Sequence, residues 1–176
     1  EKAVLPTFTL DVPVSDLPVR PSEKETSKLP ALTSRMHQGT AYGTSIHEIF
    51  EKLPLRTWAT DDLDIYQIPQ KTKEQILNFS HSDLYQKALK MTIHKEYPFF
   101  VKNGFSYIQG IIDFLAMNDT EVILIDYKTD NASLEAITNM YHEQIMTYKE
   151  ALTMLYPDKT ISTYIYSLSN QEFIEI

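Results

Sequence analysis

The chain contains no cysteine, one tryptophan and only four glycines among its 176 residues. Without cysteine it can form neither a disulfide framework nor a cysteine-ligated zinc or iron–sulfur centre. The absence of thiols fits a reducing cytoplasm, which is the compartment we expect. No apolar run approaches the length of a membrane span, and no signal-peptide pattern opens the sequence. The length and the ordinary hydrophobic and charged fractions favour one globular domain with its own core.

Basic residues are also few, because 16 Lys and Arg face 24 Asp and Glu, giving a net charge of −8. This balance argues against a free-standing protein that binds nucleic acid tightly. It does not exclude an enzyme that acts on nucleic acid, since acidic metal ligands add to the count and a neighbouring domain could deliver DNA. No G-x-x-x-x-G-K-[ST] loop occurs. The first residue is Glu1, so we expect a fragment of a longer protein, with any ATP site elsewhere.

Proline is concentrated at the start of the chain, where five of the nine prolines fall within the first 30 residues. Proline removes backbone donors and ends helices, so this segment is predicted to be non-helical. We interpret residues 1–38 as an arm or linker, with a short edge strand at Thr7–Leu10, and residues 39–176 as the domain.

The apolar pattern of the domain predicts helices, then three strands, then a helix and a last strand. Ile46, Ile49, Phe50 and Leu53 have the spacing of one helix face, and Pro54 ends that helix. This order favours an α/β domain with a mixed sheet. The other predicted helices are Lys71–Phe79, Ser82–Lys90 and, as one helix or two, Leu134–Leu155. The predicted strands are Lys95–Val101, Tyr107–Met117, Val122–Tyr127 and Thr160–Leu168.

The centre of the domain is predicted to be a β-hairpin. Two apolar runs, Ile108–Met117 and Val122–Tyr127, flank the polar pair Asn118-Asp119, which is typical of a hairpin turn. Each run carries one carboxylate among β-branched residues, at Asp113 and Asp126. A carboxylate within an apolar strand is costly unless a charged group meets it. Two facing carboxylates would repel one another, and a divalent cation relieves that repulsion.

Lys128 follows Asp126 at the second position, so both side chains project from the same face of a strand, about 6–7 Å apart. A cation held by Asp113 and Asp126 would polarise a phosphodiester, and a lysine beside it would stabilise the developing charge. Spacing alone leaves open that these are two solvated acids and a surface lysine. By the same criterion His47, early in the first helix, could be a surface or capping residue.

Five short motifs occur in one order along the chain. They are G-x-x-x-H at Gly43–His47, Glu96 before Pro98-Phe99, Q-G-I-I-D at Gln109–Asp113, D-Y-K-T-D at Asp126–Asp130 and Q-x-x-x-Y at Gln144–Tyr148. Together they resemble the RecB-type nuclease branch of the PD-(D/E)XK superfamily, over roughly residues 39–168. Within that branch the pattern is similar to the nuclease domain of AddA-type (RexA) helicase–nuclease subunits. The resemblance implies a restriction-endonuclease-like fold, with a mixed central sheet flanked by helices.

The resemblance also implies a role for each motif residue. The metal ligands would be His47, Asp113, Asp126 and the carbonyl of Tyr127, and Lys128 would be the catalytic lysine. Glu96 would lie near the metal, through water or at a second metal position. Gln144 and Tyr148 would contact the scissile phosphate or the ligand shell. Ile112 replaces the proline of the family's Pro-Asp, a departure that this branch often shows. The absence of the four cysteines that staple related domains resembles the AddA side of the AddAB pair.

The function that the resemblance implies is a Mg²⁺-dependent DNA nuclease, an exonuclease domain in which Mn²⁺ substitutes. Its substrate would be single strands from a duplex end, unwound by a helicase part of the same parent chain during recombinational repair of double-strand breaks. An AddB (RexB)-like partner subunit is implied, and no membrane. Two alternatives remain open. One is a catalytically inactive module that docks proteins or DNA ends, although inactive relatives generally lose an acid or the lysine. The other is a stand-alone RecB-like nuclease.

Overall fold

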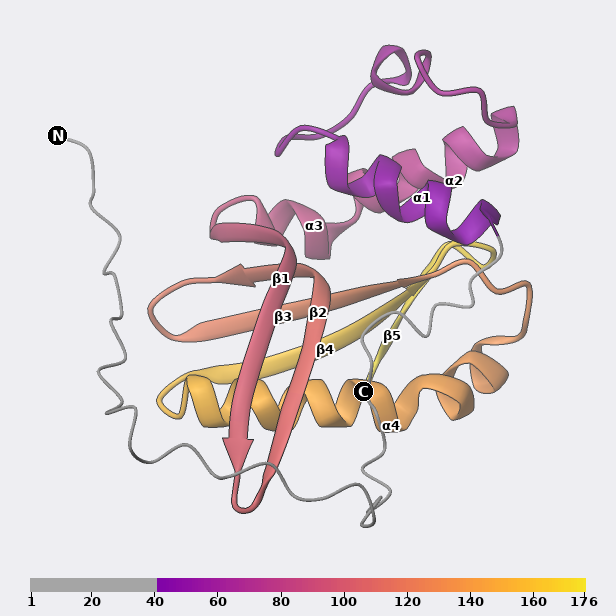
Figure 1. Ribbon diagram of the computed structural model, residues 1–176. Helices are drawn as coiled ribbons and strands as arrows, with labels where there is room; N and C mark the ends of the chain where they lie inside the picture. Colours follow the sequence, from indigo (N-terminus) through magenta and orange to yellow (C-terminus); the bar gives the residue numbers. More distant parts are fainter. Residues whose placement is uncertain (1–40) are drawn as a thin grey trace, which may run out of the picture. The chain divides into compact units, whose positions relative to one another are not determined.

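The computed structural model describes residues 41–176, which are drawn in colour in Figure 1. The predicted Pro-rich arm and its strand at Thr7–Leu10 lie outside the described residues, as does the boundary at residue 38, so these stay predictions. Within the described part, no helix combines the length and the apolar character needed to cross a membrane.

The described part contains five helical segments and five strands. The helices are α1 (Ala41–Lys52), the 3-10 turn η2 (Thr60–Leu63), α2 (Gln70–His81), α3 (Asp83–Ala88) and α4 (Leu134–Leu155). The strands are β1 (Thr92–Asn103), β2 (Ser106–Met117), β3 (Glu121–Lys128), β4 (Thr160–Ser167) and β5 (Glu172–Glu175). Every α-helix and strand predicted for this part is confirmed, and α4 is one continuous helix. The 3-10 turn and β5 were not predicted, because four residues are too few to show a period.

The five strands form one mixed sheet in the order β1-β2-β3-β4-β5. Neighbouring strands are antiparallel except for β3 and β4, which are parallel and are joined by α4. A parallel pair needs such a crossover, since the chain must return to the same end of the sheet. Helices α1, α2 and α3 lie on one side of the sheet and α4 lies on the other (Figure 1).

Each side of the sheet has its own apolar core. On the side of α1–α3 the centre is aromatic: Phe50 stacks on Tyr127 with 4.1 Å between ring centroids, and Phe79 contacts both rings edge-on. On the other side, Ile145 and Leu152 of α4 are fully buried against the sheet. Strand β3 contributes to both cores, with Ile123, Ile125 and Tyr127 on the side of α1–α3 and Val122 and Leu124 on the side of α4, so packing fixes it from two directions.

The predicted hairpin turn is confirmed at Asn118. Its side-chain oxygen accepts hydrogen bonds from the backbone N–H groups of Thr120 (2.9 Å) and Glu121 (2.8 Å), which closes the turn between β2 and β3. Asparagine favours such turns because its short side chain can bond the backbone two residues further on. The turn sets the register in which Phe114 pairs with Ile125.

Strand β1 changes face once along its length. Ile93 packs toward α1–α3, whereas Tyr97 packs toward α4. In a regular strand, side chains four residues apart share a face. Between them Glu96 has a φ of 49°, the left-handed region that non-glycine residues seldom adopt. Pro98 follows two residues later, and β1 is an edge strand, as proline requires.

Strand β2 makes the matching change at Asp113. Ile112 and Leu115, three residues apart, both pack toward α4. The register places Asp113 opposite Glu96, because the flanking pairs are Lys95 with Phe114 and Tyr97 with Ile112. The two breaks therefore meet across the ladder, and they put two carboxylates at one point of the sheet.

Lys95 is expected to stabilise the domain by ending α1. Its ammonium donates hydrogen bonds to the carbonyl oxygens of Phe50 (2.8 Å), Glu51 (3.3 Å) and Leu53, which have no intrahelical partners. We expect Lys95→Met to lower the free energy of unfolding by about 1–3 kcal/mol, measured by urea denaturation. The control Lys71→Met removes an exposed lysine from α2 and should change stability by less than about 0.5 kcal/mol. Equal stability of both variants would contradict the capping role.

Candidate active site

Asp113 lies where β2 and β3 separate. The last pair between these strands is Phe114 with Ile125, and the next pair would have been Asp113 with Asp126. Instead, the Oδ2 atom of Asp113 accepts a hydrogen bond of 2.8 Å from the backbone N–H of Tyr127. The carboxylate thus replaces a ladder contact and is held by the neighbouring strand, with only 7% of its surface exposed.

His47 and Glu96 meet Asp113 at this point. The Nδ1 atom of His47 lies 3.3 Å from the Oδ1 atom of Asp113. One ligand atom from each of His47, Glu96 and Asp113 lies within 4.8 Å of the other two, so the three side chains could hold one metal ion. Strained backbone at a residue with a functional side chain is a recurrent feature of active sites. Glu96 has both features, because its backbone is in the left-handed region and its carboxylate belongs to this group.

Asp126 and Lys128 form a buried ion pair beside that group. The Nζ atom of Lys128 lies 2.7 Å from the Oδ2 atom of Asp126, and the two residues are only 4% and 2% exposed. The pair confirms that both side chains project from one face of β3. Asp126 is not in the group of His47, Glu96 and Asp113, although the sequence predicted it as a ligand with His47 and Asp113. Its role as a ligand stays a prediction.

The Oδ2 atom of Asp126 is a buried acceptor without a hydrogen bond among the described residues. The ammonium of Lys128 lies 2.7 Å from this oxygen and balances its charge, so the oxygen has an ionic partner. Buried polar atoms are almost always satisfied, and an exception calls for a ligand or a functional reason. An imidazole and several carboxylates at one point of the sheet fit a divalent cation.

The charges of the site are set by burial and by mutual attraction. Burial lowers the pKa of His47, but the contact with Asp113 outweighs it and raises that pKa above its ordinary value. Burial would raise the pKa of Asp113, yet His47 and the Tyr127 N–H hold it below its usual range. Burial raises the pKa of Asp126, an effect that Lys128 offsets only in part and Asp113 increases. Burial disfavours charge on Lys128, but Asp126 raises its pKa, so the proton stays on the lysine.

Helix α4 supplies one wall of the site. The Oε1 atom of Gln144 accepts a hydrogen bond of 3.3 Å from Lys128, and its Nε2 atom donates one of 3.2 Å to the hydroxyl of Tyr148. The predicted pairing of these two residues on one helix face is therefore present. A Cβ at Gly110 would lie 2.9 Å from the ring of Phe99 and 3.0 Å from that of Tyr148. Glycine at this position therefore allows the ring of Tyr148 to pack against β2.

Tyr141 also belongs to this wall, although it lies outside the five sequence motifs. The Nζ atom of Lys128 lies 4.0 Å from the centre of its ring, and its hydroxyl donates a hydrogen bond of 2.9 Å to Asp130. A cation over an aromatic face is attracted by the ring. Tyr141 therefore helps to fix the ammonium of Lys128. The signal in the sequence was its position one helical turn before Gln144 and Ile145.

The ring and the backbone of Tyr127 point to different environments. The ring packs on Phe50 and, edge-on, on His47 at 5.9 Å, so it belongs to the aromatic core. The backbone N–H serves Asp113. The predicted ligand role of its carbonyl oxygen stays a prediction, as do the catalytic or ligand roles of the other predicted site residues.

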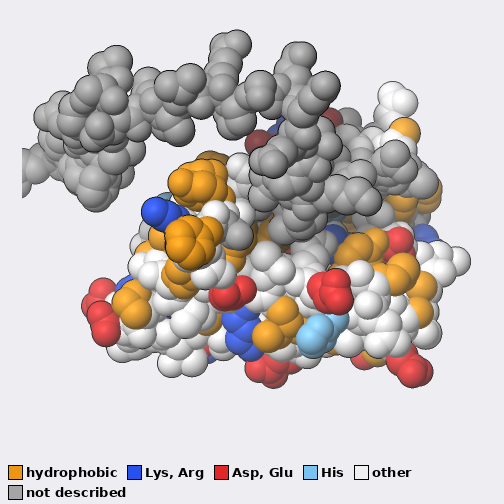
Figure 2. All heavy atoms as spheres, turned by 60° about the horizontal axis from the view of Figure 1, so that its bottom comes forward, with side chains coloured by type: hydrophobic (Ala, Val, Ile, Leu, Met, Phe, Trp, Pro, Cys, Tyr) orange, Lys and Arg blue, Asp and Glu red, His pale blue; other side chains and the backbone are white. Residues whose placement is uncertain are grey.

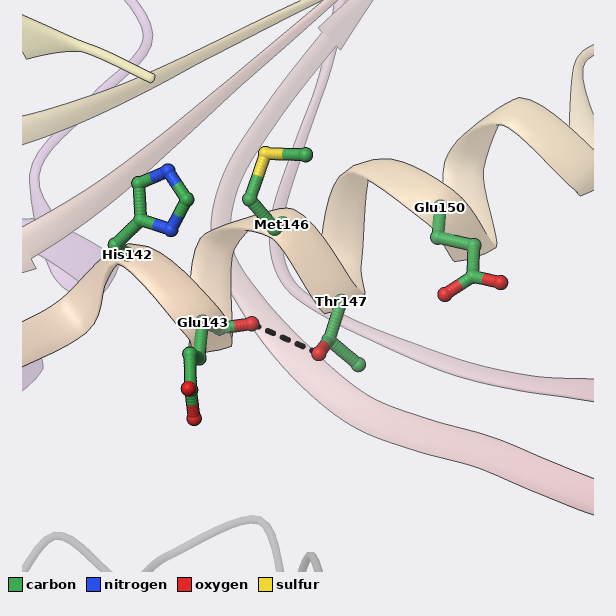
Figure 3. Close-up of a pocket in the computed structure, with 5 residues that line it drawn as sticks. All are labelled: His142, Glu143, Met146, Thr147 and Glu150. Atoms are coloured by element: carbon green, nitrogen blue, oxygen red, sulfur yellow. Dashed lines mark hydrogen bonds between the residues drawn. The ribbon is translucent and has the colours of Figure 1, made fainter.

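A shallow hollow of about 640 Å³ lies elsewhere, on the outer side of α4. Figure 2 shows this side of the molecule, and Figure 3 shows the lining residues along one helix, with Thr147 bonded to the carbonyl of Glu143. Gln144 and Tyr148 leave the helix on the opposite side, toward Lys128. The hollow is therefore not part of the candidate active site. Its lining residues are His142, Glu143, Met146, Thr147 and Glu150.

Residues 23–174 match the family model of the PD-(D/E)XK nuclease superfamily, which is most of the chain. The chain belongs to the PD-(D/E)XK nuclease superfamily. The mixed five-stranded sheet with flanking helices agrees with this assignment, so the predicted fold class is confirmed.

The curated relatives that the chain matches are named as ATP-dependent helicase/nuclease A subunits. The chain is 28% identical over 171 residues to that of Streptococcus suis and 27% identical over 172 residues to that of Streptococcus mutans, in both cases over 85% of the chain. A 92-residue stretch is 35% identical to the corresponding protein of a Thermoanaerobacter species, covering 51% of the chain and 8% of the relative. The predicted resemblance to helicase–nuclease A subunits is confirmed. The chain spans only 14% of the length of the two streptococcal relatives.

Glu96 offers a test that separates backbone strain from ligand chemistry. Glycine adopts a φ of 49° without steric cost, whereas glutamine keeps the strain and loses the charge. We expect Glu96→Gly and Glu96→Gln to weaken Mn²⁺ binding by a similar factor, about tenfold, in calorimetric titrations. We also expect the glycine variant to be about 1 kcal/mol more stable than the glutamine variant. Unchanged Mn²⁺ affinity in both variants would remove Glu96 from the metal site.

Proposed function

We propose that this chain is a metal-dependent deoxyribonuclease domain that hydrolyses phosphodiester bonds of single-stranded DNA. The observation that carries the proposal is the buried ion pair of Asp126 and Lys128 next to the group formed by His47, Glu96 and Asp113, whose ligand atoms lie within 4.8 Å of one another. Membership of the PD-(D/E)XK nuclease superfamily supports it.

His47, Glu96, Asp113 and Asp126, with the carbonyl of Tyr127, are the groups that would hold Mg²⁺ or Mn²⁺. When bound, such a cation would supply Lewis-acid polarisation of the phosphate and would lower the pKa of a coordinated water. Mg²⁺ prefers hard oxygen ligands, and three carboxylates provide them. His47 adds a nitrogen ligand, which suits Mn²⁺ as well.

Lys128 acts on the substrate side of this site. Its ammonium is fixed by Asp126, by Gln144 and by the ring of Tyr141. A fixed cation of this kind donates hydrogen bonds to the phosphate oxygens on which charge develops, and it also orients an attacking water. Gln144 and Tyr148 extend the row of donors along α4, where they would contact the scissile phosphate.

The parent protein is proposed to be a helicase–nuclease of the AddA type. Its relatives are named as ATP-dependent helicase/nuclease A subunits, and the chain covers about one seventh of their length. A helicase elsewhere in the parent would unwind a broken duplex and deliver single strands, with an AddB-like partner subunit. This delivery would allow an acidic domain, with a net charge of −8, to work on a polyanion in recombinational repair.

The test is incubation of the 176-residue chain with end-labelled single-stranded DNA. We expect degradation with Mg²⁺ or Mn²⁺ and none with EDTA. Ca²⁺ should bind but support little turnover, because its loose coordination suits the reaction poorly. A folded chain that binds Mn²⁺ and leaves the DNA intact would favour the alternative, an inactive module for docking DNA ends or proteins. Equal cleavage with EDTA would contradict the metal dependence.

A further inference from the structure

Within residues 41–176, the hairpin of β1 and β2 has one covered face and one bare face. Phe99, Val101 and Ile108 are buried against α4. On the other face Phe100 and Tyr107 are 62% and 57% exposed. At the turn that joins the strands, Phe105 is fully exposed, next to Gly104 with its left-handed φ of 59°. In Figure 2, hydrophobic side chains gather where this hairpin projects. Exposed rings grouped in this way mark an interaction surface.

The two rings on the bare face are already stacked. The centroids of Phe100 and Tyr107 lie 4.9 Å apart, and their planes differ by 19°. They are diagonal neighbours across the ladder, because Phe100 pairs with Gln109 and Tyr107 with Lys102. Stacked rings on a rigid sheet offer a flat apolar face to a further planar group. The bases of a single strand are such groups.

The charge around the rings suits a polyanion. Residues 97–112 contain no Asp or Glu, although the whole chain contains 24 of them. Lys102 is exposed between the rings and the turn. The outer side of α4 differs, since Glu143 and Glu150 line its hollow. The acid that reaches the hairpin comes from α4, where Glu150 accepts a hydrogen bond of 2.8 Å from Asn103. Aromatic rings beside a basic side chain, on strand residues that carry no carboxylate of their own, suit single-stranded nucleic acid.

The bare face leads directly to the candidate active site. Its two strands contain Glu96 and Asp113 further along, near the middle of β1 and in the second half of β2. From Tyr107 to Asp113 is six residues, or about 20 Å along a strand, a distance that a few nucleotides span. A single strand stacked on the rings would therefore have its backbone directed to the carboxylates.

We propose that Phe100, Tyr107 and Phe105, with Lys102, form a platform on which bases of the single-stranded DNA substrate stack while a neighbouring phosphate is in the active site. This inference rests on the proposed nuclease function and adds a substrate-binding surface to it. Stacking is tolerant of sequence, since every base has a flat face. The platform therefore favours a strand with unpaired bases over a duplex, whose bases are covered.

The first test is photocrosslinking of the 176-residue chain to an oligothymidylate that carries 5-iodouracil, in EDTA so that nothing is cleaved. A stacked 5-iodouracil should crosslink to the peptides that contain Phe100, Phe105 or Tyr107. Crosslinks confined to other segments would overturn the platform. This readout needs no cleavage, so the crosslinks can appear even if the chain is not a nuclease. Conversely, the chain can cleave DNA even if no crosslink forms at these rings.

The second test compares steady-state cleavage of a long oligothymidylate by matched variants. Phe100→Ser combined with Tyr107→Ser should raise KM about tenfold or more, with the effect in KM rather than in kcat. Phe100→Tyr and Tyr107→Phe keep flat rings and should keep KM within about twofold of the parent value. Met140→Ser and Met146→Ser, which remove exposed apolar side chains from α4, are the controls.

The fold of each variant is checked by thermal melting. If the double variant does not fold, Lys102→Glu takes its place, since this exposed side chain can be replaced without disturbing the rings, and it should raise KM several-fold at low salt. An unchanged KM in a folded ring or charge variant would overturn the platform and would indicate that the bare face binds another protein. A parent chain that cleaves no DNA but crosslinks through these rings would contradict the nuclease function alone.

Discussion

Replacing Lys128 with methionine is expected to reduce DNA cleavage about a thousandfold and to lower the free energy of unfolding by about 3 kcal/mol. Activity is expected to fall because the fixed ammonium that we propose to contact the phosphate is lost. Stability falls because Asp126, only 2% exposed, is left as a buried charge without its partner. The two losses are measured separately, by the rate of cleavage with Mg²⁺ and by urea denaturation.

A second substitution separates these two effects. In the double variant Lys128→Met, Asp126→Asn the unpaired charge is gone, so we expect most of the stability to return while cleavage stays absent. Lys52→Met is the matched control, because its pair with Glu48 is exposed and 3.6 Å long, and it should change stability by less than about 0.5 kcal/mol. Normal cleavage by a folded Lys128→Met variant would refute the catalytic role of this lysine.

The amide variant Asp113→Asn is expected to lose cleavage about a thousandfold and to bind Mn²⁺ at least about tenfold more weakly. If the amide oxygen keeps the hydrogen bond from the Tyr127 N–H, the amide nitrogen faces His47 and cannot ligate a cation. The fold should survive, since the shape and one hydrogen bond are kept. Calorimetric titration with Mn²⁺ and circular dichroism measure the two properties.

Asp119→Asn is the control for this variant, because Asp119 lies exposed in the turn between β2 and β3 and loses the same charge. It should bind Mn²⁺ and cleave DNA as the parent chain does. The assignment of Asp113 would be wrong if both asparagine variants gave the same Mn²⁺ titration as the parent.

Much of the fold followed from local periodicity. The apolar spacing of Ile46, Ile49 and Phe50 predicted α1, and the apolar run Val122–Tyr127 after the turn at Asn118 predicted β3. The order of helices and strands was enough for a mixed α/β sheet, which the structure confirms. Strand β5 escaped prediction because its four residues depend on pairing with β4 and carry no pattern of their own.

The side-chain neighbours within one element were also predictable. Asp126 and Lys128 share a face because alternate residues of a strand do, and Gln144 meets Tyr148 because they are one helical turn apart. The break at Glu96 was not predictable in this way. A left-handed residue within a strand contradicts the period that the prediction uses, and it is kept only because packing on both sides of the sheet holds it.

The sequence by itself determined which elements form, which acids lie within strands, and which pairs share a face, because each of these depends on backbone geometry over a few residues. The tertiary structure alone decided that His47 and Glu96 reach Asp113, that an oxygen of Asp126 is buried without a hydrogen bond, and that Phe100 and Tyr107 remain bare. These facts depend on strand register and on the packing of α1 and α4 against opposite faces of the sheet. Such contacts join residues far apart in the chain, and no local period encodes them.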